Sequence, residues 1–369
     1  MEQLKMYYRE LIGSNYEVGK QLGEYFKQVP AFIQNQIAGD FQLTNEEEKS
    51  MRALFDTYCP GINEELAGYS EALGIDLKKT IYYAMTYLRP GCSQMALLPS
   101  KTEKGHVLLA RNYEFNEAFE DNTFCLTKIQ GRYAHIGSTI ALFGRTDGMN
   151  EWGLGVSQSS AGLPVANIKY ARKPAIVGLQ FWAVIRALLE NCKDVDEAID
   201  YVKDMPIAYN INLIVADRKG KATLIETLEG RKAFKSIDST AEEQYLHSTN
   251  HMHLEELKAI EPKSMRHSVV RYKLIKNTLD TKKQVTKDDI KTLLSTEYPK
   301  GLCCHYYEEF FGTLRGIIFD LTEGKAEVCF GSTALNKWHS FSLDHKEKYK
   351  EYLVNVKRER MAPELYEWI

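Results

Sequence analysis

The stretch "RPGCSQM", residues Arg89–Met95, marks the one clear change of composition along the chain. Before it, residues 1 to about 90 carry apolar side chains at helical spacing, as in "NEEEKSMRALFDTYCPGINEELAGYSEALG". After Cys92 come short β-prone runs such as "HVLLARN" and "WGLGVSQ", separated by Gly, Asn and Asp. The change predicts a helical leader over residues 1–91, followed by a strand-rich domain over residues 92–369.

The strand-rich part also contains helical segments. Two hairpins are expected, one turning at Lys219-Gly220 and one at Glu323-Gly324. Helical spacing predicts helices over residues 175–192, 194–205 (capped by Asp194), 268–279, 286–295 and 344–360. Because strands and helices cluster without strict βαβ regularity, the expected fold class is α+β, with antiparallel sheets covered by helices.

Composition argues against several classes of function. The 369 residues carry 47 basic and 50 acidic side chains, so there is no basic excess of the kind that binds nucleic acid. No apolar run approaches the roughly 18–20 residues that cross a bilayer, and "MEQLKMYYREL" lacks the apolar core of a secretory signal. Seven cysteines without regular spacing suit a reducing compartment. We therefore expect a cytoplasmic protein with no nucleic-acid, membrane or cofactor partner, and a homo-oligomer stays open.

Cys92 is the candidate nucleophile, although a buried core thiol is the ordinary alternative for any single cysteine. Gly91 and Ser93 are small neighbours, and the position divides the helical segment from the strand-rich one. If the Gly91–Cys92 bond were cut, Cys92 would carry a free α-amine with a pKa of about 8 beside its own sulfur. Such an amine can act as general base for the adjacent nucleophile, and no catalytic histidine is then required.

Four later stretches contain polar side chains that could complete a site around this thiol. They are "LLARNYEF", "RTDGMNEWGLGVSQ", "YLHSTNHMH" and "SMRHSVVRY", and their candidate residues are Arg111, Glu114, Asn150, Asn250, Arg266 and Arg271. Acyl transfer through a thiol needs groups that favour the thiolate, orient the amine and stabilise an oxyanion. Taken singly, each arginine reads as a member of a surface ion pair, Asn250 as a strand-end cap, and Asn150 as a turn residue.

Taken in order, Cys92, "RNYEF", "DGMNEWGL", "STNH" and "SVVR" resemble the motifs of the N-terminal nucleophile (Ntn) hydrolases. The similarity is to the choloylglycine hydrolase and penicillin (isopenicillin N) acyltransferase branch, and it spans roughly residues 91–335. It implies a four-layer αββα sandwich with the nucleophile on the first residue of a strand. A leader of 91 residues that ends in glycine resembles the acyltransferase-like members, which excise a long leader and leave two chains.

The resemblance also implies a role for each candidate. Cys92 is the expected nucleophile, its freed amine the base, and Arg111 the group that favours the thiolate. Asn150 and Asn250 are expected to donate to the oxyanion, where losing one donor typically costs about 2.7–4 kcal/mol. Arg271, with Arg266 as the alternative, completes the site. Glu114 stands where the family usually has an aspartate that orients the amine. At this position the sequence departs from the family's pattern. The implied reaction is transfer of the acyl group of a small N-acyl amide, a linear C–N bond, through a thioester to water or to another amine.

Other interpretations remain open at this level. "GLCCHYYEEFF", with Cys303, Cys304 and His305, and "HSTNHMH", with three histidines, are candidate metal sites, although adjacent cysteines cannot easily face one ion. A papain-like protease would need a Cys–His pair with the cysteine at the start of a long helix, which the strand-like sequence after Cys92 disfavours. A non-catalytic or metal-binding protein of the same fold, or a precursor without amidase activity, is the alternative from a different class.

Overall fold

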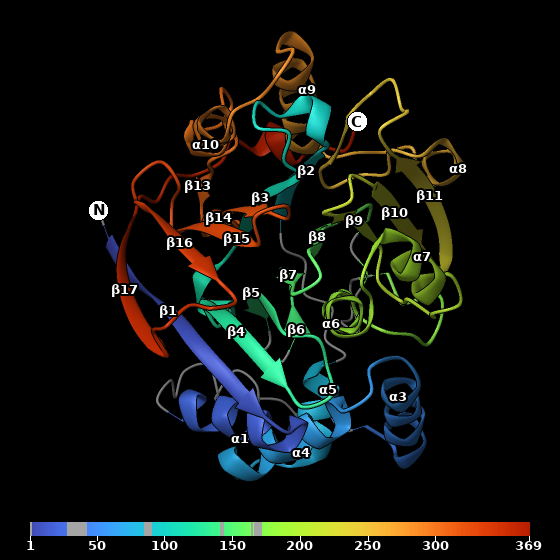
Figure 1. Ribbon diagram of the computed structural model, residues 1–369. Coiled ribbons are helices and arrows are strands. Elements are labelled where there is room, and N and C mark those ends of the chain that lie inside the picture. The colour runs from blue at the N-terminus through green and yellow to red at the C-terminus, as the bar shows by residue number, and fades with distance from the viewer. Residues whose placement is uncertain (1, 28–42, 85–90, 141–143, 164, 166–171) are drawn as a thin grey trace.

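The computed structural model describes residues 2–27, 43–84, 91–140, 144–163, 165 and 172–369. Arg89 and Pro90 of the opening stretch lie outside the described residues, whereas the Gly91–Cys92 peptide lies within them. Most of the described chain is arranged in two β-sheets with helices on their outer sides (Figure 1).

The larger sheet crosses the middle of the molecule and is mostly antiparallel. Ten strands belong to it among the described residues. In spatial order they are β11 (Arg231–Ile237), β10 (Ala222–Leu228), β9 (Ile211–Asp217), β8 (Leu154–Ser160), β7 (Asp147–Asn150), β5 (His135–Ile140), β4 (Thr123–Ile129), β1 (Glu2–Gly13) and β17 (Tyr349–Val356), with β6 (Gly144–Arg145) paired to β5.

The smaller sheet carries the candidate nucleophile. Its seven strands among the described residues run in the order β12 (Tyr245–Ser248), β2 (Gly91–Leu97), β3 (Leu108–Phe115), β14 (Phe311–Asp320), β15 (Lys325–Phe330) and β16 (Trp338–Ser342), with β13 (His305–Tyr306) paired to β14. Cys92 is the second residue of β2 and lies opposite Tyr113 of β3.

The layers follow the order helix, sheet, sheet, helix (Figure 1). β2 and β3 of the smaller sheet pack against β8 and β9 of the larger one. The smaller sheet is covered on its other side by α9 (Arg266–Thr281) and α10 (Lys287–Ser295). The larger sheet is covered by α6 (Phe181–Asn191) and α7 (Val195–Lys203), and α1 (Asn15–Phe26) packs on β1. The expected α+β class and the αββα sandwich are confirmed.

The residues before Cys92 are not wholly helical, which corrects the expectation for this segment. They contain α1, α3 (Asn45–Tyr58), α4 (Ile62–Leu73) and α5 (Leu77–Ala84), but Glu2–Gly13 forms strand β1. β1 pairs parallel with β4 and antiparallel with β17, so it lies inside the larger sheet. Its Lys, Glu and Leu residues favour a helix locally, and pairing on both sides overrides that preference.

The charged segment near the C-terminus also differs from the sequence prediction. Residues 344–360 were expected to be helical, and the structure places strand β17 there. The apolar side chains Tyr352, Val354 and Val356 alternate with more exposed residues, which is the period of a half-buried strand. The many charges on the exposed side obscured this alternation.

The signals that act over a few residues are confirmed. β9 and β10 turn at Lys219-Gly220, and β14 and β15 turn beside Gly324. Asp194 accepts the backbone N–H of Glu197 and caps α7, as expected. Gly74 ends α4 with a left-handed backbone (φ 67°), which glycine adopts without strain. Among the described residues, no helix combines the length and the apolar character needed to span a bilayer.

Candidate active site

The thiol of Cys92 lies between the two sheets and has no exposed surface. The guanidinium of Arg111 donates from Nη2 to Cys92 Sγ at 2.7 Å. The side-chain amide of Gln158, on β8 of the facing sheet, lies 3.8 Å from the same sulfur. A cation and an amide donor therefore converge on the sulfur from two different strands.

Gly91 occupies a place that no larger residue fits. A Cβ built on it would come within 2.4 Å of the ring of Phe311 and 3.2 Å of the Glu114 Cβ. The peptide bond before the thiol is thus packed directly against β14 and β3. Glycine at this position is explained by close backbone approach.

Arg111 is fixed on its other side by the start of β7. Its Nη1 donates to the carbonyl oxygen of Thr146 at 2.6 Å and to Asp147 Oδ2 at 3.0 Å. Asp147 is itself buried and accepts the backbone N–H of Ser138 through its other oxygen. The sequence analysis did not select Asp147, although it stands in the quoted "RTDGMN".

Asn250 and Arg271 surround the backbone of Cys92. Asn250 Oδ1 accepts the Cys92 N–H at 3.2 Å and Arg271 Nη2 at 2.7 Å. Arg271 Nη1 donates to the Cys92 carbonyl oxygen at 2.6 Å and to Ser93 Oγ at 2.8 Å. The alternative residue, Arg266, is 43% exposed in its side chain and pairs with Glu367, so the structure brings Arg271 and not Arg266 to the thiol's peptide.

Glu114 faces Gly91 across the β2–β3 ladder and is completely buried. Burial raises the pKa of its carboxyl to about 7, although Arg271 and Arg111 both act to lower it. The side chain of Glu114 packs beside Gly91, with its Cβ 3.2 Å from the position that a Gly91 Cβ would occupy.

The buried surroundings keep Cys92 protonated in the intact chain. Burial raises the pKa of the thiol to about 12, and Glu114 adds to the rise. The positive charges of Arg111 and Arg271 oppose it without cancelling it. To attack as a thiolate at neutral pH, this thiol therefore needs a general base that takes its proton.

Asn150 is not part of this group, contrary to expectation. Its side-chain amide donates to the carbonyl oxygens of Leu189 and Cys192, at the end of α6. Its Oδ1 accepts the backbone N–H groups of Trp152 and Leu154. All of the usual hydrogen bonds of the carboxamide are made within the turn and with the end of α6, so Asn150 has the structural role that its "DGMN" context favours.

Gln158 is the donor that the sequence analysis missed. It lies eight residues after Asn150, in the quoted "WGLGVSQ", and its Nε2 lies beside the thiol instead. The available signal was a buried polar residue within a glycine-spaced apolar strand. Such a signal is weak because Ser157, Ser159 and Ser160 of the same strand share it.

The histidines of "HSTNHMH" gather around Tyr272 of α9: His247 and His253 stack on its ring, and His251 meets it edge-on. The rings of His247 and His253 lie nearly parallel to Tyr272, at centroid distances of 4.2 and 4.5 Å. His253 Nε2 accepts the Thr249 N–H, and His251 Nδ1 lies 2.8 Å from Ser268 Oγ. These nitrogens face the protein's own groups, so the cluster holds the strand end that carries Asn250 and does not form a metal site.

Acid is expected to destabilise the fold through this cluster. Burial lowers the pKa of His247 to about 4, below the unfolded value of 6.5, so the unfolded chain binds a proton that the folded chain excludes. His247→Phe keeps the stacking and removes the titration. Relative to this variant, the wild type should lose about 1.4 kcal/mol of unfolding free energy per pH unit below pH 6.5, until the window ends at a pH of about 4.

Urea unfolding of both proteins at several pH values measures this difference. Comparing the two is necessary because burial raises the pKa of Glu114 and Glu226 to about 7, and these groups add stability as the pH falls. Parallel pH profiles for the two proteins would contradict the assignment of a proton-excluding role to His247.

The adjacent cysteines turn to separate partners. Cys303 Sγ lies 3.9 Å from His305 Nε2 and 3.4 Å from Ser332 Oγ, whereas Cys304 Sγ faces the carbonyl oxygen of Leu302. The two sulfurs do not share one ligand position. Cys92, for its part, lies on a strand and not at the start of a helix, which removes the papain-like interpretation.

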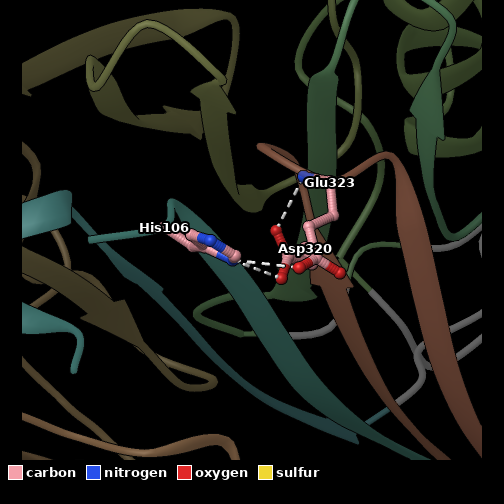
Figure 2. Close-up of side chains that lie close together, drawn as sticks. All are labelled: His106, Asp320 and Glu323. Carbon is pink, nitrogen blue, oxygen red and sulfur yellow. Dashed lines mark hydrogen bonds and ion pairs between the residues drawn. The ribbon is translucent and has the colours of Figure 1, made fainter. Parts of the chain in front are cut away.

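One further group has the spacing of metal ligands: His106, Asp320 and Glu323 at the end of the β14–β15 hairpin (Figure 2). The imidazole Nδ1 of His106 lies 2.8 Å from Asp320 Oδ2. Lys287 Nζ lies 2.7 Å from the same oxygen, so an ammonium group already neutralises this carboxylate. The group is an ion-pair network at the start of α10, at the opposite end of the β3–β14 ladder from the site of Cys92.

Comparison with known proteins identifies the family of this chain. Residues 100–335, more than half of the chain, match the family described as acyl-coenzyme A:6-aminopenicillanic acid acyl-transferase. The chain belongs to this family. The resemblance to the Ntn enzymes of the acyltransferase and choloylglycine hydrolase branch is thereby confirmed, and the chain is of the Ntn amidohydrolase or acyltransferase type.

The acyl-transferase match includes Arg111, Glu114, Asn250 and Arg271 but begins after Cys92, so the nucleophile rests on geometry. Among solved structures, a mutant of conjugated bile acid hydrolase from Clostridium perfringens is similar, with 16% identity, a TM-score of 0.45, and coverage of 74% of this chain and 99% of that one. Penicillin V acylase from Agrobacterium tumefaciens has 15% identity, a TM-score of 0.45, and coverage of 70% and 90%. No curated protein sequence matches the chain.

Proposed function

We propose that this protein is a self-processing cysteine amidohydrolase or acyltransferase that cleaves the linear amide of a small N-acyl substrate through a thioester on Cys92. Residues 1–91 are then the leader and residues 92–369 the catalytic domain. The observation that carries the proposal is the convergence of Arg111, Asn250 and Arg271 on the sulfur and backbone of one cysteine that follows a glycine.

Self-cleavage uses the same thiol against its own preceding carbonyl. Cys92 Sγ attacks the Gly91 carbonyl carbon, the Gly91–Cys92 C–N bond breaks, and the thiol proton ends on the departing α-nitrogen. Gly91 is then a thioester on Cys92, and water hydrolyses it to a carboxylate and a free thiol. We assign the exchange of this proton to the Glu114 carboxyl, which belongs to the residue opposite Gly91 and whose pKa burial raises to about 7.

In the mature enzyme the freed α-amine of Cys92 acts as the general base. It takes the proton of the Cys92 thiol, while Arg111 favours the thiolate that results. Asn250 Oδ1, which accepts the Cys92 N–H in the intact chain, holds the amine in place. The thiolate attacks the substrate carbonyl, the amine leaving group takes the proton, and water or an acceptor amine then resolves the thioester.

Gln158 takes the oxyanion role that the resemblance implied for Asn150. Its Nε2 is a neutral donor near the sulfur, where the negative charge of a tetrahedral intermediate develops. The amide of Asn250 donates instead to the Ser160 carbonyl oxygen, which fixes its Oδ1 toward the Cys92 nitrogen. We therefore assign Asn250 to the amine and Gln158 to the oxyanion.

The acyl-enzyme itself is the direct test. Mature protein is mixed with penicillin V or a conjugated bile acid, quenched in acid, and weighed by mass spectrometry. We expect the fragment beginning at Cys92 to gain the mass of one acyl group, and hydroxylamine to remove it, because a thioester reacts with this nucleophile. The same measurement is made on Gln158→Leu. If both proteins cleave a substrate and neither carries an acyl adduct, the thioester route is contradicted.

A non-catalytic protein of the same fold is the competing interpretation. It predicts that the chain stays intact and that no amide in such a panel is turned over. Under this alternative the buried guanidinium beside Cys92 would serve only packing, and its replacement would change stability alone.

A further inference from the structure

Asn212, on β9 of the larger sheet, makes two hydrogen bonds to the strand end that carries Asn250. Its Nδ2 donates to the carbonyl oxygen of Thr249 at 2.9 Å and to that of His251 at 2.8 Å. The side chain of Asn212 is completely buried. One carboxamide therefore holds the main-chain carbonyl groups of the two residues that flank Asn250.

We propose that Asn212 is a positioning residue, which clamps the backbone around Asn250 and so aims the Asn250 carboxamide at the nitrogen of Cys92. This inference rests on the proposed function, since that nitrogen belongs to the bond cut in self-cleavage and becomes the base in turnover. Nothing in the sequence motifs points to Asn212, because it stands inside the apolar strand "INLIVAD".

The clamp works because both acceptors belong to the main chain. Asn250 lies between Thr249 and His251, so fixing the carbonyl oxygens of both neighbours restricts backbone rotation in the segment 249–251. Thr249 also donates from its hydroxyl to the Ser268 carbonyl, and its own carbonyl accepts from Ser159 Oγ. Of the two carbonyl groups, that of His251 therefore depends most on Asn212.

The same residue ties the strand of the nucleophile to the larger sheet. Gln94, two residues after Cys92 on β2, donates from Nε2 to the backbone carbonyl of Asn212 at 2.9 Å. Its Oε1 accepts the hydroxyl of Ser157 on β8. Asn212 thus contacts both pieces that must stay in register: its main chain holds the strand of Cys92, and its side chain holds the segment of Asn250.

The test compares Asn212→Ala with Asn210→Ala, a matched control. Asn210 is also buried and asparagine, but its Oδ1 accepts the Glu229 N–H and does not contact the Asn250 segment. Self-cleavage at Gly91–Cys92 is followed by intact mass and normalised to the folded fraction. We expect Asn212→Ala to cleave about ten- to hundred-fold more slowly, the scale on which small misplacements act, and Asn210→Ala to cleave at the wild-type rate.

A second readout does not depend on cleavage. In a Cys92→Ala background, hydrogen exchange of the backbone N–H at position 92 reports its bond to Asn250 Oδ1. We expect Asn212→Ala to speed exchange at position 92 and at residues 249–251, whereas Asn210→Ala should leave these sites protected. Asn212→Ser, which keeps one donor in a smaller change, should give intermediate values and serves if the alanine variant does not fold.

The two readouts separate failure of the clamp from failure of the function. Equal exchange at position 92 in the Asn212 and Asn210 variants, or unchanged cleavage in Asn212→Ala, overturns the clamp. If wild type does not cleave at all, the proposed function fails, and the exchange measurement alone still decides whether Asn212 positions Asn250.

Discussion

Cys92→Ala is expected to stay one unbroken chain, while the wild type divides into two pieces, the second beginning at Cys92. The reason is that the proposed cleavage uses the Cys92 sulfur as its nucleophile, with Arg111 Nη2 at 2.7 Å from it to favour the attack. Alanine removes the atom that forms the thioester and leaves the surrounding packing nearly unchanged. Amide-cleaving activity should disappear with the cleavage, because the same sulfur carries both reactions. Intact mass of fresh and incubated protein measures the first effect.

Two further variants sharpen this result. Cys92→Ser keeps the shape and offers a hydroxyl, which is a much weaker nucleophile than a thiolate at neutral pH, so its cleavage should be slow or absent. Cys329→Ala, on β15 of the same sheet, removes another buried thiol and should cleave at the wild-type rate. If the Cys92→Ala chain also divided after residue 91, a contaminating protease would be making the cut. The free α-amine would then not arise from self-cleavage, and the proposed mechanism would be contradicted.

Arg186→Met is expected to lower the free energy of unfolding by about 3–5 kcal/mol, because it leaves two buried carboxylates without their cation. Arg186 of α6 donates to Glu65 of α4 at 2.6 Å and to Glu190 at 2.7 Å, and all three side chains are buried. Burial alone would lower the pKa of the guanidinium, but the carboxylates of Glu190 and Glu65 outweigh it and raise that pKa. The urea midpoint measures the loss.

A surface carboxylate on α4, the helix of Glu65, provides the control. Glu71 of α4 pairs with Lys20 in a solvent-exposed bridge, so Glu71→Gln should change the midpoint little. A midpoint for Arg186→Met as high as that of Glu71→Gln would mean that the buried triad adds no stability.

The Arg186 triad bears on what happens to residues 1–91 after a cut. It joins this segment to the catalytic domain, and β1 of the same segment lies between β4 and β17. Removing the segment would uncover a buried charge and open the larger sheet, so we expect the two pieces to stay together through gel filtration and to separate only in denaturant. Under the proposed function, this segment is a structural part of the protein as well as a leader.

Several features of the site could be predicted from the sequence, and others could not. The residues expected to form the site are Cys92 after Gly91, with Arg111, Glu114, Asn250 and Arg271, and the structure brings them together around the sulfur and backbone of Cys92. Each stands in a short motif whose order along the chain matches the resemblance. Asn150 was assigned to the oxyanion on the same grounds and proved to be a turn residue. A motif identifies a segment, but it does not say which of its polar side chains faces the thiol.

Gln158, Asp147 and Asn212 show why that limit exists. Each is a polar residue in or beside an apolar strand, and its partner belongs to a strand or turn distant in the sequence. Whether such a side chain faces the nucleophile depends on the register and twist of two packed sheets. No local pattern records either quantity.

The sequence by itself determined what depends on a few neighbouring residues: the Asp194 cap, the Gly74 helix end, the two hairpin turns and the alternation that places strands after Cys92. Backbone conformation at these points follows from local hydrogen bonds and from the freedom of glycine. Only the tertiary structure decided that residues 2–13 and 349–356 are strands, that Asn250 faces the Cys92 nitrogen, and that Cys92 is buried as a thiol. These outcomes depend on pairing and burial between segments far apart in the chain, where free energy is gained only once the whole sandwich has formed.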